Sequence, residues 1–223
     1  HGGRFYRAWW HNVPSEYRKY ITIDAKRTCE YDYSQLNPHM VYFLRDKKMG
    51  NEDAYGRVFD GEHRDIVKEA FNAMIQASTN LSQKPKKLDL SQVDLDWPTL
   101  KQAILDAHKP IADVFFQGHG NHLQFIDSCI VENVMLNFIR AEDTPVLPVR
   151  DSFIMHYAYG ELDELEEEMR RSFHGHFKKD INVKSEIGVM LPSSFDGKDW
   201  SDLTFEEQTH GPPEYSQWED RNF

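Results

Sequence analysis

The stretch Glu30-Tyr31-Asp32-Tyr33-Ser34-Gln35-Leu36-Asn37-Pro38 joins a predicted strand to a predicted helix. Alternating apolar residues over 20–31 predict the strand, and apolar residues at helical spacing over 35–44 predict the helix. Asp32 therefore lies where a rigid strand ends and a helix N-terminus, with its outward N–H groups, begins. This position suits a metal ion bound to a polyphosphate. The alternative interpretation is that Asp32 and Ser34 cap the helix.

Residues 146–155, Val-Leu-Pro-Val-Arg-Asp-Ser-Phe-Ile-Met, form a second informative stretch. Two short apolar runs flank Arg150-Asp151-Ser152, and this pattern predicts a tight hairpin with Asp151 at its tip. Asp32 and Asp151 are far apart in the chain, yet each is predicted to follow a strand.

These two stretches together resemble motifs A and C of the family A DNA polymerases and the related single-subunit phage-type RNA polymerases. In those families, Asp-Tyr-Ser-Gln and a His-Asp-Glu or His-Asp-Ser hairpin carry the two metal-binding carboxylates of the palm. Arg150 stands where the families have His, and Ser152 follows the phage-type variant. The resemblance implies an α+β fold with an antiparallel palm sheet covered by helices, and Asp32 and Asp151 as catalytic residues. It also implies two Mg²⁺ ions, with Mn²⁺ as an alternative, bound by both aspartates and by the Tyr33 backbone.

A helix is predicted over residues 62–78, where apolar residues recur at helical spacing. Arg64 and Lys68 are four residues apart and therefore lie on one side of this helix. The resemblance implies that the helix is motif B, whose Arg and Lys bind the phosphates of the incoming nucleotide, although the family's following aromatic residue is absent. The alternative is a solvated helical face. With residues of motif A added, the predicted nucleotide-binding set is Ser34, Gln35, Asn37, Arg64 and Lys68.

Residues 4–14 are rich in arginine and aromatic side chains and resemble the segment that precedes motif A in family A polymerases. Arginines pair with phosphates and interleaved aromatic rings stack on bases. The alternative is that the adjacent Trp9 and Trp10 belong to the core. A long helix is predicted over residues 123–139, and the resemblance implies that its Gln124 reaches the primer–template minor groove. The predicted nucleic-acid-binding set is Arg4, Arg7, Asn12, Gln124 and Arg150.

Helices over residues 99–107 and 160–177 and a strand over residues 181–190 are also predicted. Cys29 and Cys129 lie in apolar elements without zinc spacing, which is typical of reduced buried thiols.

The formal net charge of −11 over 223 residues is the strongest argument against nucleic acid binding, because proteins that bind a phosphate backbone normally present a positive field. The charge is unevenly distributed, since residues 1–27 are mainly basic and residues 194–223 are mainly acidic. A further acidic block, residues 161–168, is predicted to be a solvated helical face.

The sequence is predicted to contain a basic and aromatic segment (residues 1–27), a palm (residues 28–191) and an acidic C-terminal tail (residues 192–223). Reduced fingers, about residues 45–120, are inserted between motifs A and C. No apolar run approaches the roughly 20 residues that a membrane-spanning helix needs, and no signal peptide opens the chain, so we expect a cytoplasmic protein without a membrane partner. Because there is no room for a thumb before Arg4, we expect either that upstream chain is missing from this sequence or that another chain supplies thumb-like contacts.

These features predict a template-directed nucleotidyltransferase whose partners are a nucleic acid primer–template and a nucleoside triphosphate. Of the two metal ions, one would activate a 3′-hydroxyl and the other would neutralise the triphosphate during in-line displacement. One alternative is a catalytically inactive, polymerase-derived palm that acts as a binding or assembly module, which the acidic composition and the charge of Arg150 favour. A second alternative is a metal-dependent nuclease that uses the same aspartates.

Overall fold

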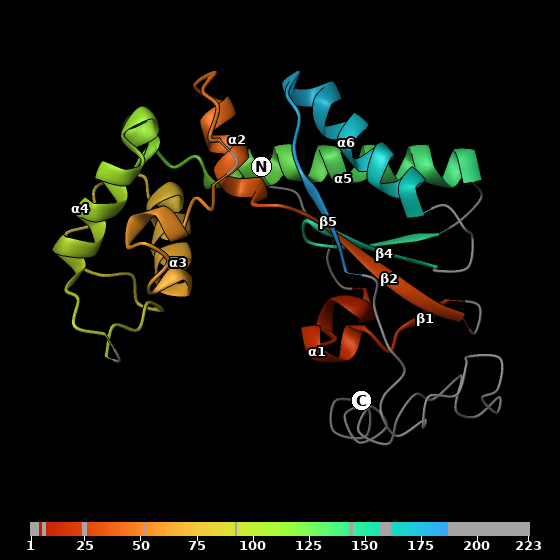
Figure 1. Ribbon diagram of the computed structural model, residues 1–223, viewed down its shortest axis with the longest axis horizontal. Coiled ribbons are helices and arrows are strands. Elements are labelled where there is room, and N and C mark those ends of the chain that lie inside the picture. The colour runs from red at the N-terminus through yellow and green to blue at the C-terminus, as the bar shows by residue number, and fades with distance from the viewer. Residues whose placement is uncertain are drawn as a thin grey trace. The chain divides into compact units, whose positions relative to one another are not determined.

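The computed structural model describes residues 5, 8–23, 26–50, 52–91, 93–142, 145–156 and 162–186. The chain divides into two compact units, whose elements are labelled in Figure 1. Among the described residues, the helical unit comprises residues 35–128, and the sheet unit comprises residues 5–34 and 129–186. Most of the helical unit is therefore an insertion in the sequence of the sheet unit. The three-part division expected from the sequence stays a prediction.

An antiparallel sheet of five strands forms the centre of the sheet unit. Strand β2 (Lys26–Tyr33) pairs with β4 (Ser152–His156), and β4 pairs with β3 (Val146–Val149). The first residues of β2 pair with β1 (Thr22–Ile23), and its last residues pair with β5 (Val183–Glu186). The predicted hairpin over residues 146–155 is confirmed, because Val149 lies opposite Ser152 across a two-residue loop.

One face of this sheet packs against helix α6 (Leu162–Phe177). The ring of Tyr33 lies 6.4 Å from that of Phe153 and 6.0 Å from that of Phe173 on α6. The Tyr33 hydroxyl donates a hydrogen bond of 2.6 Å to the carbonyl oxygen of Met169, so this buried polar group is satisfied. Because side chains alternate along a strand, Glu30 and Asp32 on β2 lie on the opposite face.

The opposite face packs against the 3-10 helix η1 (Trp9–Asn12) and the one-turn helix α1 (Ser15–Arg18). A buried cluster forms there, with Trp10 packed against it, and its members are Val13, Ile21, Val149 and Ile154. The indole N–H of Trp10 donates to the carbonyl oxygen of Pro148 at 3.0 Å. The neighbouring Trp9 is 48% exposed. Trp10 therefore contributes to the core, as the alternative interpretation of the two tryptophans expected.

Helix α6 corrects the prediction of a fully solvated acidic face. Glu168 is 6% exposed, and its carboxylate accepts hydrogen bonds from Asn137 at 2.9 Å and from Ser172 at 2.8 Å. The solvated-face prediction was wrong at this residue, because Glu168 lies three residues after buried Leu165 and therefore on the buried stripe of the helix. The hydrogen bonds, together with an ion pair to Arg171, offset the cost of burying the carboxylate.

The helical unit packs α2 (Leu36–Phe43), α3 (Arg64–Gln76) and α4 (Trp97–Ala107), together with the 3-10 helices η2 (Gly56–Val58) and η3 (Lys109–Val114). Helix α4 begins earlier than predicted, because the Asp96 side chain accepts the N–H of Thr99 at 2.8 Å and a proline stands in the first turn. The fully buried core of the helical unit includes Met40, Phe71, Met74, Leu100, Ile104 and Phe115.

A buried histidine lies in this core. His108 is 0% exposed; its Nε2 lies 3.0 Å from the carbonyl oxygen of Ala54, and its Nδ1 lies 3.1 Å from the Tyr42 hydroxyl. These distances fit a neutral ring that donates from Nε2 and accepts at Nδ1. Burial, and to a smaller extent the nearby charge of Arg57, lower the pKa of His108 to about 4, although the bond to Ala54 opposes the change.

Helix α5 (Gly120–Glu142) begins where it closely approaches α3. A Cβ atom added at Gly120 would lie 2.7 Å from the Cγ atom and 3.1 Å from the Cα atom of Gln76. Glycine therefore permits this contact between the two helices. The part of α5 up to Ser128 belongs to the helical unit, and the rest belongs to the sheet unit.

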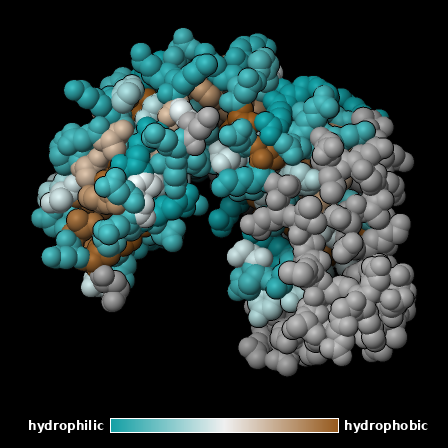
Figure 2. All heavy atoms as spheres, in the orientation of Figure 1, coloured by the Kyte–Doolittle hydropathy of each residue, from teal (hydrophilic) through white to brown (hydrophobic). Residues whose placement is uncertain are grey.

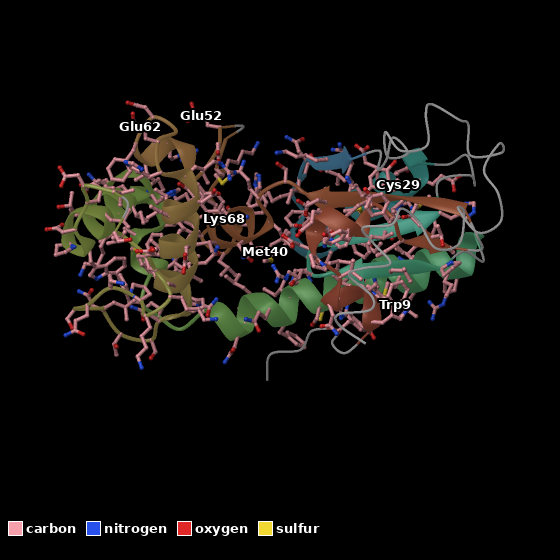
Figure 3. All side chains as sticks on the ribbon, turned by 90° about the horizontal axis from the view of Figure 1, so that it is seen from below. Trp9, Cys29, Met40, Glu52, Glu62 and Lys68 are labelled. Atoms are coloured by element: carbon pink, nitrogen blue, oxygen red, sulfur yellow. The ribbon has the colours of Figure 1, made fainter. Side chains whose placement is uncertain are left out.

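Both cysteines are free thiols. Cys29 lies on β2 (Figure 3), where burial raises the pKa of its thiol to about 12. Cys129 is only half-buried, so the prediction that it is buried was wrong. Much of the face visible in Figure 2 is hydrophilic, and no helix in the described parts of the chain combines the length and apolar character needed to cross a membrane.

Candidate active site

Asp32 and Asp151 line one recess of about 350 Å³ in the sheet unit. Asp32 pairs in register with Ser152, and the N–H of Tyr33 donates to the carbonyl oxygen of Asp151 at 3.4 Å. This pairing brings the end of β2 next to the hairpin between β3 and β4. We call this hollow the Asp32 recess; its lining residues are Ser15, Arg18, Glu30, Asp32, Val149, Arg150, Asp151, Ser152 and Lys184.

The hairpin loop consists of Arg150 and Asp151. Arg150 has φ 59°, the left-handed region that glycine usually supplies at the first position of a two-residue loop. A non-glycine residue in this conformation is strained, and such strain concentrates at functional sites. The hairpin therefore holds the Asp151 backbone in a defined place while it keeps a cation beside the carboxylate.

The Asp32 recess contains three acidic and three basic side chains. Besides the predicted Asp32, Asp151 and Arg150, it contains Glu30, Arg18 and Lys184, which the sequence analysis did not assign. The sequence contained a signal for Glu30, which is two residues before Asp32 and so shares its face of β2. Lys184 is the partner of Asp32 on β5, and only the structure gives this register. Arg18 is brought there only by the packing of α1.

The carboxylates of Asp32 and Asp151 are the groups in the Asp32 recess best placed to hold a divalent metal ion. Across the described segments, no cluster of three or more His, Cys, Asp or Glu side chains forms a metal cage. Mg²⁺ is usually held by one or two carboxylates together with substrate phosphates, and two carboxylates in a water-accessible recess fit that chemistry. The backbone carbonyl of Tyr33 is the third predicted ligand.

The other residues of motif A are engaged within the fold. The N–H of Tyr33 is bonded to Asp151, and the N–H of Ser34 donates to the carbonyl oxygen of Asn182 at 2.8 Å. These two N–H groups are therefore occupied within the fold, and the predicted contacts of Tyr33, Ser34 and Gln35 to phosphates stay predictions. Gln35 adopts φ 55° before α2, and its Oε1 accepts the N–H of Ala54 at 2.6 Å.

The two basic residues of the predicted motif B differ in their surroundings. Arg64 pairs with Asp53; its Nη2 donates to Asp53 Oδ1 at 3.3 Å, and its guanidinium lies 5.4 Å from the centre of the Tyr55 ring. Burial raises the pKa of Asp53, but the hydrogen bonds from Arg64 and Tyr55 outweigh this effect and leave the pKa below its usual value. Lys68 is exposed on α3 (Figure 3).

Asn37 and Gln124, predicted for different ligands, line the same pocket in the helical unit. The Asn37 side-chain amide donates to Asn72 Oδ1 at 3.2 Å, and the Asn72 amide donates to the Lys68 carbonyl at 2.9 Å. Four carboxamide side chains therefore surround one pocket of about 200 Å³. We call it the amide pocket; its lining residues are Asn37, Asn72, Ile75, Gln76, Gly120, Leu123 and Gln124.

The predicted nucleic-acid-binding residues do not form one set. Arg4 and Arg7 lie outside the described residues. Asn12 is exposed on η1 in the sheet unit, and Arg150 lies in the Asp32 recess. Gln124 belongs to the helical unit. Their roles in binding nucleic acid stay predictions.

The fold is similar to that of a known polymerase domain. The POL domain of Pol1 from M. smegmatis, solved in complex with DNA primer-template and dNTP, superposes with a TM-score of 0.54 and 15% sequence identity over 80% of this chain. The match covers 43% of that domain, so the chain spans less than half of its relative. No protein-family model and no curated protein sequence matches the chain. At this identity the likeness concerns the fold, and it confirms the predicted α+β fold with a polymerase palm-like antiparallel sheet.

Proposed function

We propose that this chain is the palm and reduced fingers of a template-directed nucleotidyltransferase. It transfers a nucleotidyl group from a nucleoside triphosphate to the 3′-hydroxyl of a primer paired with a nucleic acid template. The observation that carries the proposal is the presence of Asp32 and Asp151 in one recess of a palm-like sheet. The polymerase likeness of the fold supports it.

In this proposal, Asp32, Asp151 and the Tyr33 carbonyl hold two Mg²⁺ ions, for which Mn²⁺ can substitute. Bound metal would supply charge neutralisation for the triphosphate and a lowered pKa for the primer hydroxyl. The protein's own contribution is placement, because the β2–β4 register sets the separation of the two aspartates. Precise placement of reacting groups contributes a large part of catalysis in phosphoryl transfer.

The basic residues have proposed roles in binding phosphate. Lys68 is exposed and is proposed to bind the triphosphate, whereas Arg64 is first a partner of Asp53. Ser34 and Gln35 support the strand-to-helix connection through their internal hydrogen bonds. Asn37 and Gln124 are proposed to contact the nucleotide and the primer–template respectively. Arg4, Arg7, Asn12 and Arg150 are proposed to bind nucleic acid.

The test is primer extension with Mg²⁺ or Mn²⁺, using the parent chain and the variants Asp32→Asn and Asp151→Asn. Each variant removes one carboxylate charge with little change in volume, so we expect extension to fall by about 1,000-fold. Asp113→Asn is the control, because Asp113 is an exposed partner of Arg45 in the helical unit. Equal activity in the three variants and the parent would exclude this site.

One observation favours a second candidate, a binding module without catalysis. The three basic side chains of the Asp32 recess offset its three acidic ones, which weakens the attraction for a metal ion. A chain that binds primer–template but extends it with neither metal would support the module. A chain that degrades the primer through Asp32 and Asp151 would instead be a nuclease.

A further inference from the structure

Glu30 links two elements on the metal-binding face of the sheet. Its Oε1 accepts a hydrogen bond from the Ser152 hydroxyl and lies 3.2 Å from Arg18 Nη1. The side chains of Arg18 and Glu30 are only 20% and 24% exposed, so this ion pair is largely shielded from water. Ser152 follows Asp151 directly and lies opposite Asp32. Glu30 therefore connects α1 to the hairpin that carries Asp151.

Glu30 does not satisfy the whole guanidinium of Arg18. A guanidinium has five N–H donors, and within the described residues the Glu30 carboxylate is its ion-pair partner through Nη1. The Nε atom of Arg18 is buried, and no described residue accepts its proton. A buried N–H donor without an acceptor destabilises the fold, unless a bound ligand or another interaction in the site offsets that loss of free energy. Arg18 thus keeps donor capacity beyond the bond to Glu30.

Arg18 also borders two neighbouring hollows. It lines the Asp32 recess and a second hollow of about 180 Å³, and both include Ser15, Arg18 and Glu30. Lys19 and Thr28 line the second hollow. The first contains Arg150 and Lys184 as well. Arg18 is therefore the arginine that lines both hollows.

We propose that Arg18 is a phosphate-binding residue and that Glu30 is the positioning residue that aims it. A planar fork of N–H donors beside hydroxyl groups suits phosphate oxygens, which accept such bonds in pairs. Glu30 pairs with Nη1 and so fixes the orientation of the guanidinium, and the second terminal nitrogen, Nη2, is left for the ligand. The source is either the triphosphate of a nucleotide or a backbone phosphate of a nucleic acid strand, and this assignment of sources rests on the proposed function.

The experiment measures binding without turnover, by calorimetry in Mg²⁺ buffer. The probes are tripolyphosphate and a single-stranded oligonucleotide without terminal phosphates. We expect Arg18→Gln to weaken binding of at least one probe by about tenfold, since charged hydrogen bonds contribute effects of that size. Glu30→Gln keeps the hydrogen-bond acceptor but removes the charge, and we expect a smaller loss of about threefold. If only the affinity for tripolyphosphate falls, the ligand of Arg18 is the triphosphate of a nucleotide. If only the affinity for the oligonucleotide falls, the ligand is a backbone phosphate.

Matched controls come from helix α6. Arg171→Gln removes the same charge from an arginine paired with Glu167 and Glu168, and Glu166→Gln breaks the comparable ion pair with Arg170. Neither arginine lines the two hollows. Thermal unfolding shows whether each variant folds, and a lower affinity at an unchanged melting temperature is not produced by a merely structural role. If Arg18→Gln does not fold, Arg18→Lys carries the test, because lysine keeps the charge without the fork.

If the folded Arg18 variant binds both probes as tightly as Arg171→Gln does, the proposal is wrong. Because no step depends on extension, a chain that binds phosphate through Arg18 but does not extend a primer would refute the proposed function alone. In an active preparation, Arg18→Gln should raise the KM of the substrate that supplies the phosphate while kcat changes by less than about twofold.

Discussion

The sheet unit and the helical unit each contain a polar hollow, but they build it differently. The Asp32 recess is built mainly on paired strands, and it gathers charged side chains of both signs. The amide pocket is built between helices, and its polar side chains are neutral carboxamides. A strand ladder fixes which residues are neighbours by register, whereas helices bring residues together through the shapes of their packed faces. The two hollows therefore depend on different kinds of evidence in the sequence.

The largest expected effect comes from truncating a core phenylalanine, and it tests whether the two units unfold independently. Phe71 in the helical unit and Phe153 in the sheet unit are both 0% exposed. Replacing either with Ala leaves a cavity, so we expect the free energy of unfolding to fall by about 3–5 kcal/mol. Hydrogen exchange should show faster opening mainly in the unit that carries the change. Phe125→Ala is the control, because Phe125 is 51% exposed. Equal loss of protection in both units would mean that they unfold together.

The second prediction concerns pH and applies to the helical unit. The pKa of His108 is about 4 in the fold and about 6.5 in the unfolded chain, so the unfolded chain binds more protons between these values. The contribution of His108 to the free energy of unfolding is greatest above about pH 6.5. It falls by up to about 3 kcal/mol as the pH drops toward 4. Urea unfolding at several pH values measures it. His108→Gln should flatten this part of the profile, and an unchanged slope would contradict the assignment.

The third prediction tests the approach of α5 to α3. Gly120→Ala places a methyl group 2.7 Å from Gln76 Cγ and 3.1 Å from its Cα, so we expect a loss of about 1–3 kcal/mol. Gly175→Ala on α6 is the matched control, since nothing lies within 4 Å of its added Cβ. Alanine there should stabilise the chain by about 0.5–1 kcal/mol. Thermal unfolding measures both variants. Equal changes in melting temperature would show that the contact at Gly120 is not tight.

The smallest predicted effect concerns sugar selection in the amide pocket, and it rests on the proposed function. An amide at Asn37 can donate to a 2′-hydroxyl as well as accept from it, so we expect poor discrimination between dNTP and rNTP. Asn37→Glu should raise the preference for dNTP by about tenfold or less, as measured by steady-state incorporation. Asn72→Ala is the control, because it removes the partner of Asn37 without adding bulk. Strong dNTP preference in the parent, unchanged by Asn37→Glu, would show that Asn37 does not face the sugar.

Predictions from local patterns succeeded where a short stretch contains the whole signal. The hairpin around Asp151 and the helices 64–76 and 162–177 follow from apolar periodicity and turn position. The start of α4 was predicted two residues too late, although Asp96 and Pro98 are an ordinary cap and first turn. Glu168 was predicted to be solvated from its charge, but its place on the apolar stripe of α6 buries it.

The partners of individual polar groups were not readable in this way. Arg64 pairs with Asp53 across a loop, a contact that the helical pattern around Arg64 did not indicate. The bond between Asn37 and Asn72 depends on how α2 packs against α3. Such contacts join residues whose separation in sequence carries no period, so one sequence contains no signal for them.

The sequence by itself determined that two aspartates end strands and that an α+β fold surrounds them, because alternation and turn chemistry are local properties of the chain. Only the tertiary structure decided what shares a hollow with those aspartates. Arg18 reaches the Asp32 recess because Val13 and Ile21, which flank α1, are buried in the cluster on this face of the sheet, and Glu30 pairs with Arg18 there. The physical reason is that hydrophobic burial positions whole elements, and the charged side chains on them meet as a consequence.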